Sequence, residues 1–170
     1  IYGETNIDIP KHNPELKIKR VYLEPKAFAY KKAIAAIMDA DLVVIGPGDL
    51  YTSIIANLLV EGIVPALKMT TAKVVYVCNV MTKYGETNNF AASDFIREVQ
   101  RYSHQAIDHV ILNTTQPSAE LSQNYASENS FFVKPDVDGD VKYVTKTDLI
   151  SNTVLFRHNS KKLAKLIMQL

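Results

Sequence analysis

Short, nearly continuous apolar runs recur along the chain, and segments with helical character separate them. Three runs have the length and composition of buried strands: residues 41–46, 73–80 and 108–113. Apolar spacing and capping residues predict helices over 30–40, 53–59 and 64–69, a helix capped by Ser93, and a helix capped near Ser118. Apolar strands that alternate with helices are typical of a parallel sheet covered on both faces. We therefore expect a doubly wound, mostly parallel α/β fold.

The two ends of the chain carry different patterns. Residues 17–23 alternate polar and apolar side chains, which predicts a further strand. Residues 131–145, "FFVKPDVDGDVKYVT", predict two strands joined by a hairpin turn at Asp138–Gly139. Apolar residues at positions 163, 166, 167 and 170 then predict a last helix over 160–169.

Composition narrows the class of protein. The chain has 170 residues, the length of one ordinary domain. Its formal net charge of +1 does not indicate binding to nucleic acid or to an anionic membrane. Cys78 is the only cysteine, so a disulfide framework is excluded. No apolar run approaches the roughly 20 residues that cross a bilayer, and the first residues lack a signal-peptide pattern. We expect a cytoplasmic protein without membrane insertion.

Three polar loops follow the three predicted strands: "GPGDLYTS", "NVMTKYGET" and "NTTQPS". Since the carboxyl ends of parallel strands lie at one edge of a sheet, these loops are expected to lie at that same edge. Glycine lets a backbone approach a ligand closely, and the start of a helix attracts anions, which together favour a phosphate or pyrophosphate site. The candidate ligand-binding residues in the loops are Gly46, Pro47, Gly48, Asp49, Tyr51, Thr52, Ser53, Asn79, Thr82 and Asn113.

Other interpretations stay open at this point. Gly46–Pro47–Gly48 is equally compatible with an ordinary strand-to-helix turn, with Asp49 or Thr52 as the N-cap. Asp49 places a negative charge near the supposed phosphate site, unless it caps the helix or holds a metal that bridges to the phosphates. The loops match neither the Walker pattern nor GxGxxG, and the four histidines have no metal-binding spacing. The residues alone indicate no catalytic constellation.

The stretches "GPGDLYTSIIANLLVEGI", "KVVYVCNVMTKYGET", "IDHVILN" and "LFRHNSKKLAKLI" resemble the YvcK branch of the CofD-like family, the gluconeogenesis factors. The resemblance covers nearly the whole chain and implies a single CofD-like domain over residues 1–170, a Rossmann-like three-layer sandwich. Asp49 stands where the family usually has Ser, and Ala56 where it usually has Pro. The family's glycine-rich first strand and loop lie upstream of Ile1, so the chain is expected to be part of a longer protein.

The resemblance also implies function. The YvcK branch binds UDP-sugars such as UDP-N-acetylglucosamine and supports carbon metabolism, cell-wall synthesis and cell shape during gluconeogenic growth. An aromatic and an arginine tied to UDP-sugar binding in that branch correspond here to Tyr125 and Arg157. We therefore expect a regulator that binds a UDP-sugar or another nucleotide. An enzyme is the less favoured interpretation.

Two alternatives remain from the sequence. The enzyme branch of the family transfers a phospholactyl group from a nucleotide-activated donor to a deazaflavin, and Mg²⁺ would be required only under that interpretation. The second alternative is a fragment that serves chiefly in assembly, as a homodimer or with the rest of a longer protein.

Overall fold

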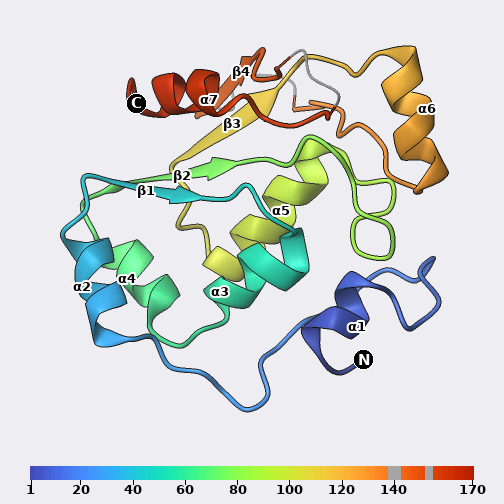
Figure 1. Ribbon diagram of the computed structural model, residues 1–170. Helices are drawn as coiled ribbons and strands as arrows, with labels where there is room; N and C mark the ends of the chain where they lie inside the picture. Colours follow the sequence, from blue (N-terminus) through green and yellow to red (C-terminus); the bar gives the residue numbers. More distant parts are fainter. Residues whose placement is uncertain (138–142, 152–154) are drawn as a thin grey trace.

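The computed structural model describes residues 1–137, 143–151 and 155–170 and has a parallel sheet at its centre (Figure 1). The four strands are β1 (Leu42–Ile45), β2 (Lys73–Val77), β3 (His109–Asn113) and β4 (Val144–Thr147), and they lie in the order β1-β2-β3-β4. All three pairings are parallel, with Leu42 opposite Lys73, Val75 opposite His109 and Val110 opposite Val144. The parallel α/β fold predicted from the apolar runs is confirmed.

The helices connect and cover these strands. The π-helix η1 (Leu50–Ile55) continues into α3 (Ala56–Leu58), and α4 (Ile63–Met69) then leads to β2, while α5 (Ala92–Ser103) joins β2 to β3. The remaining helices are α1 (Glu4–Asp8), α2 (Lys31–Met38), α6 (Ala119–Ser127) and α7 (Ser160–Ile167). No described helix is both long and apolar enough to cross a membrane.

Apolar side chains bury both faces of the sheet. Val74 and Tyr76 of β2 face the larger core, where η1, α3, α4 and α5 contribute residues such as Ile55 and Phe95. Val75 and Val77 face the opposite side, because successive residues of a strand point to opposite faces. There the sheet meets Leu163, Leu166 and Ile167 of α7 and the later residue Leu170. Figure 1 shows α7 and α5 on opposite sides of the strands, so helices cover both faces as predicted.

Residues 17–23 do not form the predicted strand. The segment runs across the surface, and the backbone N–H of Val21 donates to the Tyr102 hydroxyl at 3.1 Å. An alternating pattern forms a strand only where a second strand supplies hydrogen-bond partners, and the segment pairs with no described strand.

Two further predictions differ in detail from the structure. Helix α5 begins at Ala92 with Ala91 as N-cap, so Ser93 is not the cap; the Asp94 carboxylate accepts from the Ala91 N–H at 3.0 Å, and the Ser93 hydroxyl donates to Asp136 at 2.7 Å. The hairpin turn at Asp138–Gly139 lies outside the described residues. The described strand after it, β4, pairs in parallel with β3 instead of forming an antiparallel hairpin arm.

Candidate functional site

The turn after β1 lies against the end of β2. Gly46 has a φ of 80°, a left-handed conformation that favours glycine, and a Cβ there would lie 3.0 Å from the Val77 carbonyl oxygen. The Asn79 amide nitrogen donates to the Gly48 carbonyl oxygen at 2.9 Å. The glycines thus allow the turn to approach the neighbouring strand end, and Asn79 holds it there.

A cleft of about 1,200 Å³ opens at these strand ends, and we call it the strand-end cleft. It brings together seven of the residues predicted from the sequence: Pro47, Gly48, Asp49, Asn79, Thr82, Tyr125 and Arg157. Residues that the sequence did not single out complete the lining, among them Asp8, Lys83, Phe156 and His158. Residues of the first two predicted loops therefore line one cleft at the strand ends.

The other predicted residues lie outside the lining of this cleft. Tyr51 and Thr52 line a separate cavity of about 880 Å³, formed with the N-terminal segment, and Ser53 is exposed. The Tyr51 hydroxyl donates to Glu98 at 3.3 Å, and burial, followed by the Glu98 charge, raises the pKa of this phenol well above its ordinary value. Gly46 stands just before the lining residues Pro47 and Gly48.

Asn113 is buried and serves its own loop. Its side-chain nitrogen donates to the Thr115 carbonyl at 2.8 Å, and its side-chain oxygen accepts from the Leu149 N–H at 3.1 Å. With both ends of the amide bound within the protein, Asn113 shapes the loop after β3. The third predicted loop therefore contributes structure here instead of a lining residue of the cleft.

At the helix start after Asp49, one of the N–H groups that the sequence suggested for an anion is already bound within the protein. The Glu86 carboxylate, which is buried, accepts from the Tyr51 backbone N–H at 3.2 Å and from the Thr52 hydroxyl at 3.3 Å. Asp49 occupies the N-cap position of η1 without a capping side-chain hydrogen bond. A carboxylate of the protein thus already takes the place at this helix start that a phosphate would need.

The Asp49 carboxylate pairs with Lys83, which lies among three acidic side chains. The Lys83 ammonium donates to Asp8 and, at 2.7 Å, to Asp49, and it lies 3.7 Å from Glu86. Burial alone would lower the pKa of Lys83, but the bonds to Asp49 and Asp8 outweigh it and raise the pKa. Burial raises the pKa of Glu86, while the charge of Lys83 opposes that shift. We call these four residues the Lys83 cluster.

Carboxylates grouped in this way invite comparison with a Mg²⁺ site. Oxygens of Asp8, Asp49 and Glu86 lie within 4.8 Å of one another. However, the Lys83 ammonium already contacts Asp8 and Asp49, and both oxygens of Glu86 accept hydrogen bonds from η1. Mg²⁺ demands near-ideal octahedral oxygen coordination. The residues as arranged therefore do not fit that ion.

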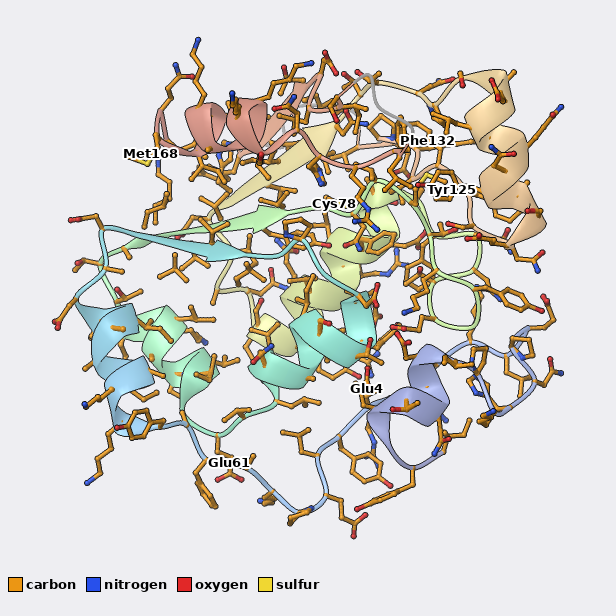
Figure 2. The ribbon with its side chains drawn as sticks, in the orientation of Figure 1. Glu4, Glu61, Cys78, Tyr125, Phe132 and Met168 are labelled. Carbon is orange, nitrogen blue, oxygen red and sulfur yellow. The ribbon has the colours of Figure 1, made fainter. Side chains whose placement is uncertain are left out.

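Tyr125 and Arg157 also line the strand-end cleft. The Tyr125 hydroxyl accepts from the Phe156 N–H at 3.2 Å, and the ring packs in an apolar cluster with Val80 and Phe132. Figure 2 shows Tyr125 and Phe132 between α6 and the sheet. The next residue, Arg157, is exposed, and its guanidinium makes no hydrogen bond or ion pair with any described residue. Tyr125 thus fixes the segment that presents an uncommitted cation to the cleft.

The remaining polar groups of the lining differ in their availability. Thr82 is buried, its hydroxyl accepts from the Phe131 N–H at 2.8 Å, and its own N–H donates to the Phe131 carbonyl at 2.7 Å. Desolvation lowers the pKa of His158, so this ring is neutral near pH 7. The side-chain oxygen of Asn79 and Nε2 of His158 are buried without a hydrogen-bond partner among the described residues.

Sequence reasoning missed Lys83, Asp8 and Glu86. Lys83 and Glu86 stand inside the quoted loop "NVMTKYGET", so their presence near the strand ends was visible. Their association with Asp8 was not visible, because Lys83 and Asp8 are 75 positions apart. A charged residue in a predicted strand-end loop was the available signal.

Comparison with known proteins places the chain among a defined set of relatives. The family model described as "2-phospho-L-lactate transferase CofD" matches residues 1–153. A Thermotoga maritima protein provisionally named a gluconeogenesis factor is 39% identical over 174 residues, which cover 98% of this chain and 54% of that protein. The gluconeogenesis factor of Halalkalibacterium halodurans is 36% identical, over 99% of this chain and 53% of its own length.

A solved structure supports the same grouping. The crystal structure of a Bacillus halodurans protein superposes with a TM-score of 0.89 at 35% sequence identity. The match covers 99% of this chain and 55% of that protein. The chain therefore spans about half the length of the relatives that it matches.

Proposed function

The chain belongs to the CofD family and is similar to its gluconeogenesis factors, and from this we propose that it binds a UDP-sugar such as UDP-N-acetylglucosamine. We further propose that it acts as a cytoplasmic regulator of carbon metabolism, cell-wall synthesis and cell shape during gluconeogenic growth, and not as an enzyme. The activity of the whole protein is part of this proposal, because the chain spans about half of its relatives.

The observation that carries the proposal is the exposed guanidinium of Arg157 at the strand-end cleft, which has no partner among residues 1–137, 143–151 and 155–170. Arginine stays charged at any physiological pH and binds two oxygens of a phosphate at once. An arginine that pairs with a carboxylate of its own protein is less available to a ligand. Arg157 has no such partner among the described residues. It is therefore available to a diphosphate.

The other lining residues suit the uncharged parts of a nucleotide-sugar. The ring of Tyr125 offers an aromatic surface against which a base or a sugar can pack. The backbone of Pro47–Gly48 has no large side chain and leaves room for close approach. The charge of Asp49, which seemed to oppose an anion, is countered by Lys83 at 2.7 Å.

Phospho-group transfer is the second candidate function, because the matching family model bears the name of a transferase. That reaction in its Mg²⁺-assisted form needs a metal site, and the Lys83 cluster does not fit one. The regulator is therefore the better-supported proposal. Turnover of a nucleotide-activated lactate with a deazaflavin acceptor would reverse this preference.

The decisive experiment is calorimetric titration of UDP-N-acetylglucosamine into the full-length protein and its Arg157→Ala variant. Loss of a charged hydrogen bond costs about 1.5–3 kcal/mol, so the dissociation constant should rise roughly 10- to 150-fold. Arg97→Ala is a matched control, because Arg97 is an exposed arginine that pairs with Asp94 on α5. Equal affinity in all three proteins, or no binding at all, would contradict the proposal.

A further inference from the structure

The Lys83 cluster holds a positive charge at the place where its three carboxylates would otherwise attract a cation. The side chain of Glu86 is fully buried, and those of Asp8 and Asp49 are 32% and 40% exposed. Three carboxylates within 4.8 Å repel one another unless a cation lies among them. The Lys83 ammonium lies there and contacts Asp8 and Asp49 directly.

We propose that Lys83 is the resident cation of the strand-end cleft, so that the cluster excludes divalent metal and ligand binding does not require Mg²⁺. The first part stands on the cluster alone. The second part rests on the proposed UDP-sugar binding. Lysine is suited to the role because its ammonium is a compact point charge with several donors, two of which bind Asp8 and Asp49 while Glu86 lies 3.7 Å away.

The surroundings of the cluster hold the carboxylates in this arrangement. Glu86 is fixed from behind by the Tyr51 N–H and the Thr52 hydroxyl. A metal ion that entered the cluster would have to displace the ammonium and break the Asp8 and Asp49 bonds. The raised pKa of Lys83 means that the side chain stays charged near neutral pH and does not leave by losing its proton.

The ion pair with Lys83 also bears on the charge of Asp49. Asp49 adds a carboxylate to the lining of the cleft that is proposed to accept a diphosphate. Lys83 at 2.7 Å offsets that charge. The bond therefore reduces the charge that Asp49 presents to the cleft, without a metal ion.

Lys83 is in addition a positioning residue for the N-terminal wall of the cleft. Asp8 ends α1, and its bond to Lys83 ties this helix to the loop after β2. The same loop holds the following segment, since Gly85 packs against Pro10 and the Asn88 amide donates to the Pro14 carbonyl at 2.7 Å. Figure 1 shows α1 beside this loop. Loss of Lys83 should loosen the wall as well as expose the carboxylates.

The test titrates Mn²⁺ alone into the full-length protein, with free Mn²⁺ followed by electron paramagnetic resonance. We expect no site at the cluster in the natural protein, a new site in Lys83→Met that binds Mn²⁺ at least tenfold more tightly than any residual binding by the natural protein, and none in the charge-keeping control Lys83→Arg. Adding Asp49→Asn to Lys83→Met should abolish the new site. Mn²⁺ binding by the natural protein that Asp49→Asn removes would overturn the inference, and so would a folded Lys83→Met variant that gains no site.

A second measurement does not depend on whether Lys83→Met folds. UDP-N-acetylglucosamine is titrated into the natural protein with excess EDTA and again with millimolar Mg²⁺, and the two affinities should agree within twofold. Loss of binding in EDTA would overturn the metal-independent part of the inference. Absence of binding under both conditions would instead sink the proposed function, while the Mn²⁺ titration would still decide the role of Lys83.

Discussion

The side-chain nitrogen of Asn79 donates to the main-chain oxygen of Gly48 at 2.9 Å, across the ends of two neighbouring strands. The bond fixes which way the amide faces, because the reversed amide would place two oxygens against each other. Both residues line the strand-end cleft. A single hydrogen bond thus sets the position of the turn after β1 relative to β2.

We predict that Asn79→Ala loosens this turn. The loss of one hydrogen bond should lower the free energy of unfolding by about 0.5–1.5 kcal/mol and should also weaken UDP-sugar binding. Urea unfolding and calorimetry measure the two effects. Asn57→Ala is a matched control, since the Asn57 amide donates to the Ser53 carbonyl at 2.8 Å on an exposed part of the helix. If both variants bind the ligand like the natural protein, Asn79 has no role in the site.

Gly46→Ala should be more damaging than Gly48→Ala. At position 46 the substitution meets a left-handed φ of 80° and a carbonyl oxygen only 3.0 Å from the new Cβ, that of Val77. Such strain costs about 1–3 kcal/mol, so we expect a clearly lower urea midpoint. At position 48 the nearest atom is the Ser53 Cβ at 3.3 Å, and φ is not in the left-handed region. Equal stability of the two variants would show that the turn adapts.

The parts of the fold that follow from the sequence are those encoded in consecutive residues. β1, β2 and β3 coincide with largely apolar runs, because a strand whose two faces are covered is rich in apolar residues. The stripe of α7 was likewise visible in its spacing. Residues 17–23 show the limit of the method, since alternation describes a surface that a strand could have but not the partner that it needs.

Only part of the candidate site could be predicted from local sequence. The Gly46–Pro47–Gly48 turn followed from residue types, but Tyr125 and Arg157 came from the family resemblance, and no local pattern pointed to them. Lys83 escaped both approaches. Its partners Asp8 and Asp49 lie 75 and 34 positions away, and an ion pair over such distances follows only from the folded chain.

Cys78 should be unreactive in the folded protein. Cys78 is 1% exposed, and burial raises the pKa of its thiol to about 12. Because the thiolate is the nucleophile, a thiol reagent at pH 8 should label the native protein only as fast as it unfolds, and one equivalent after denaturation. A Ser53→Cys, Cys78→Ser variant places the thiol at an exposed position and should label at once. Rapid labelling of native Cys78 would contradict the burial.

Asp148 should make the attachment of α7 sensitive to acid. Its carboxylate accepts from Lys162 of α7 at 2.5 Å and from the Ile150 N–H at 3.1 Å. The bond to Lys162, followed by one from the Thr115 hydroxyl, lowers the pKa of Asp148 to about 2. An unfolded aspartate titrates near about 3.9, so this stabilisation is complete above about pH 4 and disappears as the pH falls towards about 2.

The urea midpoint, measured between about pH 5 and about pH 2, tests that expectation. Asp148→Asn should flatten part of the acid-induced decline, because the amide cannot titrate, and it should lower stability slightly at pH 7. The effect is small, since the pair is largely exposed and water screens it. Asp41→Asn, at an exposed aspartate before β1, is the control and should keep the natural decline. If Asp148→Asn and the natural protein lose stability in parallel over this range, the Asp148–Lys162 pair does not hold α7 to the sheet.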